Sequence, residues 1–205
     1  MTDHGIPLRE QDVDPDPLRQ FTAWFREAET AGVRMPDAAA LATASTDGVP
    51  SARMVLVKGF DERGFVFYSN HDSRKGRELA ANPRAALLFH WDPLGRQVRI
   101  EGPVARTSVE ESAAYVRERP RASQISALAS PQSQIIDSRE ALERRVLELE
   151  ERYRGSDLPL PSGWGGFRLF PETVELWQQR QDRLHDRLRY RREDSVGWLI
   201  ERLGP

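Results

Sequence analysis

The sequence predicts a mainly β fold with flanking helices, an α+β class in which antiparallel strands close into a barrel. Between residues 38 and 91, short runs rich in Val, Leu, Phe and Ala are separated by two turn signals, at 46–48 and 61–64. A single short helical stretch interrupts these runs. The pattern favours antiparallel neighbours over the alternating strands and helices of a doubly wound sheet.

The first half of the chain divides into an arm, a helix and five strands. Residues 1–15 are polar and predict a flexible N-terminal arm, so that residues 16–205 form a single domain. Asp16 and Pro17 are typical of a helix start, and Gly32 ends the apolar periodicity that follows. The remaining pattern predicts a short helix at 73–81 and strands at 38–45, 50–59, 64–70, 84–91 and 95–106.

The second half predicts three helices and then four terminal strands. Residues 109–119 and 121–129 have helical patterns, and a longer helix follows in which Asp137 caps and Glu140 completes a capping box. Gly and Pro residues mark a loop at 155–163. The strands that follow are expected at 164–170, 173–179, 184–191 and 196–203.

Composition excludes several classes of function. The 205 residues carry 30 Lys and Arg against 32 Asp and Glu, a net charge of -2, so no global field draws the protein to nucleic acid or to an anionic membrane. There is no cysteine, which excludes disulfides and thiolate chemistry. The start of the chain lacks an export signal and no apolar run is long enough to span a bilayer, so a soluble, cytoplasmic protein is expected.

An anion site is predicted at the start of the short helix. Ser73 is the expected cap, and Arg74 and Lys75 occupy the first turn, where cations oppose the helix dipole. Free backbone amides, a hydroxyl and two cations together suit a phosphate group. The alternative is ordinary solvated surface charge.

A second basic cluster lies in the run 177–187. If this run is extended, Arg183, His185 and Arg187 point to one face while Leu184 points to the other. Such a face suits an anionic ligand, and the imidazole can change protonation near neutral pH. The alternative is a solvated basic face balanced by neighbouring aspartates.

Other polar side chains form weaker patterns. Arg53 and Lys58 stand near the two ends of one apolar strand and face opposite ways; a snorkelling lysine at the sheet edge is the alternative. Tyr115 and Arg119 share a helix face, either as a second anion site or as an ordinary surface pair. Amide and hydroxyl groups that can read a heteroaromatic ring stand at Gln97, Ser123, Gln132 and Ser133.

Several familiar catalytic and metal-binding motifs are absent from the sequence. The four histidines are scattered without metal-ligand spacing, so no metal site is expected. Neither a glycine-rich nucleotide loop nor a serine-nucleophile elbow is present. With few nucleophiles and two candidate phosphate sites, the chemistry is expected to belong to a bound phosphorylated cofactor.

Taken together, these blocks resemble one family, the flavin-dependent pyridoxine/pyridoxamine 5'-phosphate oxidases. The matching blocks run in the family's order from residue 8 to the C-terminus. No single block is as specific as their combination. They comprise residues 53–58, 67–70, 73–75, 82–84, 89–91, 96–98, 119–124, 130–133, 164–166, 177–178 and 183–187.

The resemblance implies an FMN-binding split β-barrel that forms a homodimer through its C-terminal strands. FMN would be held noncovalently at the subunit interface, with residues of both chains in each site. Matched by position, the residues implied to hold FMN are Arg53, Met54, Val55, Tyr68, Ser69, Arg74, Lys75, Gln97, Gln132, Ser133, Trp177 and Arg187.

The resemblance also implies the substrate and the reaction. Pyridoxine or pyridoxamine 5'-phosphate would be oxidised to pyridoxal 5'-phosphate with O2 as acceptor, releasing H2O2, and ammonia from the amine. Arg183 and His185 are the implied catalytic residues over the substrate ring. The implied substrate contacts are Lys58, Tyr115, Arg119 and Ser123 at the phosphate, with Arg183, Leu184 and His185 at the ring.

Departures from the family pattern leave two alternatives open. The family's N-terminal arm carries an Arg and a Tyr that fold over the substrate, whereas this chain begins almost at Gly5; further changes stand at Met35, Ser126, Leu128 and Gln179. One alternative is a related flavin oxidase that acts on another ring, such as a phenazine precursor. The other is a noncatalytic protein that binds flavin or pyridoxal 5'-phosphate.

Overall fold

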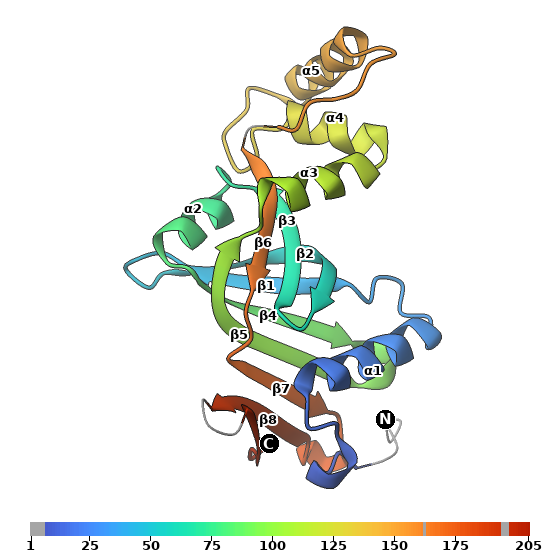
Figure 1. The fold of residues 1–205 in the computed structure, drawn as a ribbon, viewed down its shortest axis with the longest axis vertical. Helices are drawn as coiled ribbons and strands as arrows, with labels where there is room; N and C mark the ends of the chain where they lie inside the picture. The colour runs from blue at the N-terminus through green and yellow to red at the C-terminus, as the bar shows by residue number, and fades with distance from the viewer. Residues whose placement is uncertain (1–6, 162, 194–196) are drawn as a thin grey trace.

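The computed structural model describes residues 7–161, 163–193 and 197–205, and within them nine strands form one antiparallel sheet. The strands are β1 (Ala38–Ala44), β2 (Pro50–Asp61), β3 (Gly64–Asn70), β4 (Arg84–Trp91), β5 (Arg96–Arg106), β6 (Trp164–Leu169), β7 (Thr173–Gln178), β8 (Asp186–Glu193) and β9 (Gly197–Arg202). Six of them close into a barrel in the order β4-β1-β2-β3-β6-β5, because β4 also pairs with β5 (Figure 1). The prediction of a mainly β antiparallel barrel is confirmed.

The barrel is split along β5. One edge of β5 pairs with β4, while the other edge pairs first with β7, over residues 96–101, and then with β6, over residues 104–106. The crossing between β6 and β7 passes so close that a Cβ on Gly102 would lie 1.9 Å from the carbonyl oxygen of Phe170. Only glycine allows this approach. Strands β7, β8 and β9 therefore continue the sheet beyond the barrel.

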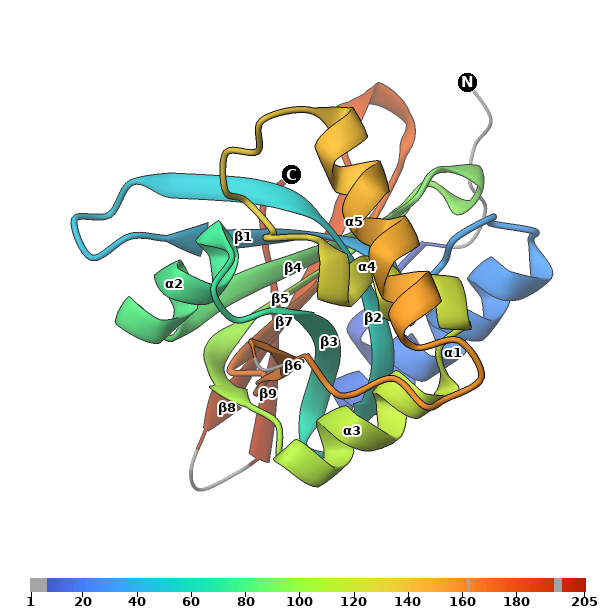
Figure 2. The ribbon, with the colours of Figure 1, turned by 90° about the horizontal axis from the view of Figure 1, so that it is seen from above.

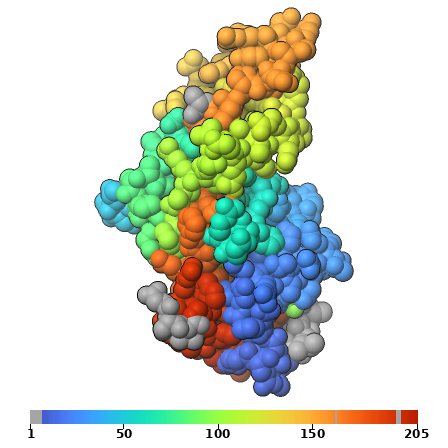
Figure 3. All heavy atoms as spheres, in the orientation of Figure 1, coloured from blue at the N-terminus to red at the C-terminus, as the bar shows by residue number. Residues whose placement is uncertain are grey.

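Helices flank the barrel, and some of them gather at one end of the molecule. They are α1 (Pro17–Thr30), α2 (Arg74–Ala81), α3 (Val109–Glu118), α4 (Arg121–Ala129) and α5 (Arg139–Arg152), with 3-10 turns η1 (Glu10–Asp12), η2 (Asp92–Leu94) and η3 (Gln181–Arg183). Helices α3, α4 and α5 lie beyond one end of the barrel, and Figure 2 shows α4 and α5 over its mouth. Strands β7 and β8 lie at the opposite end, and the space-filling view shows the same elongated arrangement (Figure 3).

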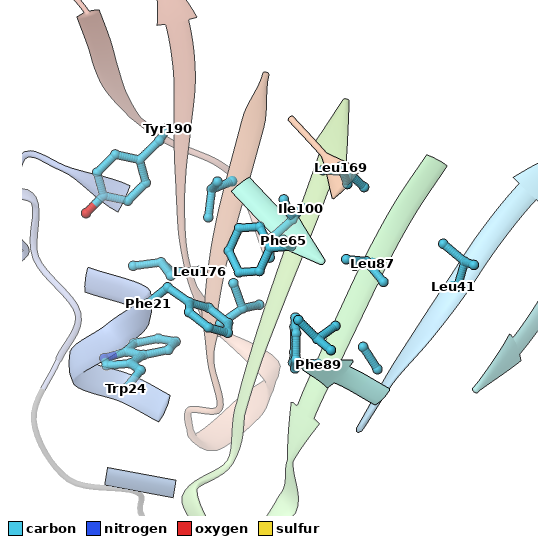
Figure 4. Close-up of a cluster of buried hydrophobic side chains, with 14 of the residues drawn as sticks. Phe21, Trp24, Leu41, Phe65, Leu87, Phe89, Ile100, Leu169, Leu176 and Tyr190 are labelled. Atoms are coloured by element: carbon cyan, nitrogen blue, oxygen red, sulfur yellow. The ribbon is translucent and has the colours of Figure 1, made fainter. Parts of the chain in front are cut away.

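An aromatic core fixes α1 against the barrel. Phe21 is fully buried and its ring centroid lies 4.9 Å from that of Phe65 and 5.0 Å from that of Phe89. Both pairs meet edge to face, the arrangement that aromatic rings prefer. Figure 4 shows Phe21 and Trp24 pointing from the helix toward the strands. The helix start is as predicted, since the Asp16 side chain accepts from the backbone N–H of Leu18.

Two local predictions were wrong. Helix α5 is capped by Ser138, whose hydroxyl accepts from the N–H of Ala141 at 3.1 Å, and not by Asp137. The strand expected at 184–191 begins at Asp186, because η3 precedes it. The side chains before Asp186 therefore do not alternate as in a strand, and Leu184 is 70% exposed instead of sharing the buried face of Leu188.

The described part of the predicted arm is packed against the C-terminal strands. Leu8 and Val13 are buried, and Arg202 of β9 donates to both carboxylate oxygens of Glu10 at 2.9 Å. The hydroxyl of Tyr190 donates to the carbonyl of Asp14. Residues 7–15 thus form an anchored strap rather than a free arm, and residues 1–6 lie outside the described residues.

The described residues contain neither a membrane-spanning helix nor a cluster of metal ligands. None of their helices is long and apolar enough to cross a membrane. Nor do their His, Asp and Glu side chains form a group of three or more that could hold a metal ion. The cytoplasmic location stays a prediction.

Candidate functional site

The start of α2, where the sequence predicted an anion site, forms a compact polar cluster. Ser73 caps the helix, its hydroxyl accepting from the N–H of Gly76 at 3.3 Å. The Lys75 ammonium is buried and donates to the hydroxyl of Ser69 at 2.9 Å and to the amide oxygen of Gln132 at 3.0 Å. Burial, with a smaller contribution from the charge of Arg53, lowers the pKa of Lys75.

Two arginines complete this cluster through one carboxylate. Arg53 of β2 donates to Glu78 at 3.1 Å, and Arg74 donates to the other oxygen of Glu78 at 2.8 Å. Arg53 is also held by the hydroxyls of Thr43 and Ser51, both at 2.5 Å. Strands β1, β2 and β3, helix α2 and the loop after α4 thus bring together five predicted FMN residues: Arg53, Ser69, Arg74, Lys75 and Gln132.

A stack of aromatic rings lies between β3, β6 and α3. Tyr68 and Tyr115 are parallel, with centroids 3.8 Å apart, and the ring of Trp164 lies 5.7 Å from that of Tyr68. Gly166 pairs with Tyr68 across the strands, and a Cβ there would lie 3.0 Å from the tyrosine ring. The small residue therefore makes room for the stack.

Arg119 joins this stack to a pocket. Its guanidinium lies 4.9 Å above the ring of Trp164, a cation–π contact. Its Nη1 atom is buried and has no hydrogen-bond partner among the described residues. A pocket of about 250 Å³, lined by Arg119, Trp164 and Gln132 among others, lies beside it. An unsatisfied buried cationic donor calls for an acceptor that the chain does not supply, which suits an anionic ligand.

A second group of predicted residues lies on the C-terminal strands. Gln97, Trp177 and Arg187 are directly opposite one another on β5, β7 and β8. They line a pocket of about 240 Å³. Glu175 lies at its wall and accepts from Arg187 at 2.8 Å and from Arg99 at 2.5 Å.

The predicted catalytic pair stands at the edge of this second group. The ring of His185 lies 4.6 Å from that of Trp177, and its Nδ1 accepts from the backbone N–H of Arg180 at 3.1 Å. Asp182 and Arg183 have positive φ angles of 54° and 60°. Asp tolerates this conformation, whereas Arg rarely adopts it, so the backbone at Arg183 is strained.

The remaining predicted residues are spread over the surface. Lys58 pairs with Asp37 at 2.6 Å, and it lies in the irregularity of the β2–β3 register between Val57 and Gly59. Met54 is 64% exposed. Exposed or half-buried positions are also occupied by Val55, Ser123, Ser133 and Leu184.

The structure places three of the departures from the family pattern. Gln179 has no positive φ, and its N–H donates to the carbonyl of Gly95 at 2.8 Å, so a side chain is tolerated there. Ser126 lines the pocket beside Arg119. Met35 is exposed on the surface.

Sequence reasoning missed the carboxylates that hold the predicted cations. These are Glu78, Glu175 and Asp37. Only the contact of Glu78 could be predicted from local sequence, because Arg74 and Glu78 are four residues apart on one helix. The other two meet their arginine or lysine through strand pairing, which no short motif reveals.

Comparison with known proteins identifies the family. The model of the family described as pyridoxamine 5'-phosphate oxidase matches residues 25–153. The model described as the pyridoxine 5'-phosphate oxidase C-terminal dimerisation region matches residues 164–205. The chain belongs to the pyridoxamine 5'-phosphate oxidase family. The predicted family and the predicted oxidoreductase class are therefore confirmed.

Curated relatives of this family cover nearly the whole chain. The pyridoxine/pyridoxamine 5'-phosphate oxidase of Rubrobacter xylanophilus is 59% identical over 97% of this chain and 91% of its own length. The protein of the same name from Salinibacter ruber is 55% identical over 97% of this chain and 93% of its own length.

Two solved structures share the fold. PhzG from Burkholderia lata 383, in complex with tetrahydrophenazine-1-carboxylic acid, is 35% identical and superposes with a TM-score of 0.91 over 98% of both chains. A pyridoxamine 5'-phosphate oxidase-related, FMN binding protein from Nostoc punctiforme is 20% identical, with a TM-score of 0.73 over 93% of this chain and 98% of its own, which supports the split-barrel fold.

Proposed function

We propose that this oxidase uses FMN to convert pyridoxine or pyridoxamine 5'-phosphate to pyridoxal 5'-phosphate, with O2 as acceptor and H2O2 as product. The observation that carries the proposal is the identity of 53–59% to several relatives named for these substrates. The family assignment supports FMN as the cofactor and makes a noncatalytic role the weaker alternative.

The cluster at α2 fits the phosphate of FMN. Arg53, Arg74 and Lys75 carry three positive charges, and the carboxylate of Glu78 offsets one of them. The net charge complements a phosphate dianion, and the helix N-terminus adds backbone donors. FMN, when bound, supplies the hydride acceptor.

The substrate phosphate is assigned to Arg119, with Tyr115 and Ser123 as its other predicted contacts. The unpaired Nη1 of Arg119 supports this, because its hydrogen-bonding capacity is left for a ligand. The stacked Trp164 holds the guanidinium plane in place. Lys58 joins this group only if it exchanges its present partner, Asp37, for the phosphate.

His185 is proposed to act as a hydrogen-bond donor to the substrate. Because Nδ1 accepts from the N–H of Arg180, the neutral ring carries its proton on Nε2. The side chain then orients a ring or a hydroxyl but does not remove a proton through Nε2. Arg183 stands beside it as the positioning cation, on a backbone that the turn η3 holds in one conformation.

A homodimer is proposed because one chain divides the site into two separate groups. The cluster at α2 and the Arg119 pocket lie toward the α3–α5 end, whereas Trp177 and Arg187 lie on the strands at the opposite end (Figure 1). Exposed Met54 and Leu56 on β2 present an apolar face for a second copy. The match of residues 164–205 to a dimerisation region supports the same assembly.

An absorption experiment tests the proposed function. The purified protein is expected to be yellow, and anaerobic pyridoxamine 5'-phosphate is expected to bleach its flavin bands. This reduction should release pyridoxal 5'-phosphate and ammonia, and admission of O2 should then restore the bands and yield an equal amount of H2O2. A flavin-loaded protein that is inert to both phosphorylated substrates would contradict the proposal.

A second candidate function is oxidation of a phenazine-type ring. The likeness to the PhzG structure favours it. Turnover of a reduced phenazine carboxylic acid, with none of pyridoxamine 5'-phosphate, would reverse the order of the two candidates.

A further inference from the structure

We propose that Glu78 is the positioning residue of the FMN-phosphate site, holding Arg53 and Arg74 in the orientation that receives the phosphate. The inference rests on the proposed use of FMN and concerns a residue that does not itself contact the cofactor. It assigns a functional role to a carboxylate placed among cations that are expected to bind an anion.

Glu78 connects three elements of the fold. Its Oε2 accepts from the hydroxyls of Thr43 on β1 and Ser51 on β2, at 2.5 Å and 2.6 Å, and from Arg53. Its Oε1 accepts from Nε of Arg74, one turn earlier in α2. The carboxylate therefore ties the start of the phosphate-binding helix to the barrel wall.

The carboxylate is both buried and charged. Its side chain is 9% exposed, and burial alone would raise its pKa. The hydrogen bonds from the surrounding hydroxyls and guanidiniums outweigh burial and lower the pKa of Glu78 to about 2. Glu78 is thus ionised at every pH at which the enzyme is expected to work.

The bonding pattern leaves donors for a ligand. Among the hydrogen bonds of the described residues, Arg74 engages Glu78 through Nε alone, and its side chain is 58% exposed. Its two terminal nitrogens are therefore available to a phosphate. Arg53 is fixed at both terminal nitrogens and contributes its charge from a defined place.

Loss of the Glu78 carboxylate would have two opposing effects on phosphate affinity, one through charge and one through geometry. Without the carboxylate, three cations lie together with no anion among them, which increases the attraction for a phosphate. The same loss removes the hydrogen bonds that orient the guanidiniums of Arg53 and Arg74. A glutamine has only one acceptor oxygen. Its NH2 group would face donors that now donate to the second carboxylate oxygen. We infer that positioning is the larger effect, because charge-assisted hydrogen bonds require defined geometry.

The test compares two flavins that differ only in the phosphate. The apoprotein is titrated with FMN and with riboflavin, following quenching of flavin fluorescence, for wild type, Glu78→Gln and Glu78→Asp. We expect Glu78→Gln to weaken FMN binding about 10- to 100-fold and to leave riboflavin binding within about twofold. Glu78→Asp keeps the charge and should recover part of the FMN affinity. Glu143→Gln is the matched control, because it removes an exposed Arg–Glu pair of the same spacing on α5.

The other outcomes of these titrations would overturn either the role of Glu78 or the proposed function. Equal losses of FMN and riboflavin affinity would mean that Glu78 only stabilises the fold, and tighter FMN binding by Glu78→Gln would mean that it competes with the phosphate; either overturns the inference. If Glu78→Gln does not fold, Ser51→Ala removes one donor to the carboxylate, and an unchanged ratio of FMN to riboflavin affinity in this variant overturns it. A wild-type protein that binds neither flavin contradicts the proposed function instead.

Discussion

The ring of Tyr68 on β3 lies parallel to the ring of Tyr115 on α3, with centroids 3.8 Å apart and planes 8° apart. Tyr68 is a predicted flavin contact and Tyr115 a predicted contact of the substrate phosphate. The stack therefore joins the two predicted contacts in one packed surface, which Trp164 extends.

Two substitutions of Tyr115 distinguish the contribution of its stacked ring from that of its hydroxyl. Tyr115→Ala removes a ring pair that contributes about 0.5–1.5 kcal/mol beyond area burial, so FMN affinity should fall roughly 2- to 10-fold and KM should rise. Tyr115→Phe keeps the stack, so FMN affinity should stay at the wild-type value while KM for the phosphorylated substrate rises. Flavin titration and steady-state kinetics measure both. An equal loss of FMN affinity in the two variants would show that the stacked ring pair does not contribute to FMN binding.

Arg119 is expected to recognise the substrate phosphate through donors that lysine lacks. Arg119→Lys should raise KM for pyridoxamine 5'-phosphate roughly 10- to 100-fold, because a charge-assisted hydrogen bond contributes about 1.5–3 kcal/mol, and should leave kcat nearly unchanged. Arg121→Lys is the control, since Arg121 binds backbone carbonyls on the surface. A fall in kcat at constant KM would place Arg119 in the chemical step instead.

The apolar face of β2 is expected to lie in the dimer interface. Met54→Asp would bury an unpaired charge there, so the dimer should dissociate at micromolar concentration and lose bound flavin. Sedimentation velocity measures the assembly. Val109→Asp, at an exposed position on α3, is the control and should leave the dimer intact. A Met54→Asp protein that remains dimeric would place the interface elsewhere.

The Glu10–Arg202 pair makes the attachment of the N-terminal strap depend on pH. Hydrogen bonds from Arg202 lower the pKa of Glu10 from 4.5 to about 2, so the stabilisation is complete above pH 4.5 and is lost as pH falls toward 2. Glu10→Gln should lower Tm by about 1–3 °C at pH 7, and the difference from wild type should shrink below pH 4.5. Glu62→Gln, on an exposed turn, is the control. A difference that grows on acidification would contradict the assignment.

The sequence was most informative where local chemistry decides structure. The caps Asp16 and Ser73, the turn at 61–64 and the barrel strands are set by neighbouring residues, and each lies where it was predicted. The prediction was wrong in placing a strand at positions 184 and 185, because the turn η3 just before them, with its positive φ angles, depends on contacts such as Arg180 to His185. It also misplaced the cap of α5 by one residue, since Asp and Ser are equally good caps and only packing chooses between them.

By itself the sequence determined the class of fold, the family and the capped, cationic start of α2, because strand alternation, helix caps and motif blocks are properties of short stretches of chain. The tertiary structure alone decided that Glu78 receives Arg53 and Arg74 together, and that the predicted site divides into groups at opposite ends of the molecule. Those relations depend on how distant strands pair and on which helix covers which end of the barrel. No local pattern encodes them, since the residues that meet are separated by long stretches of sequence.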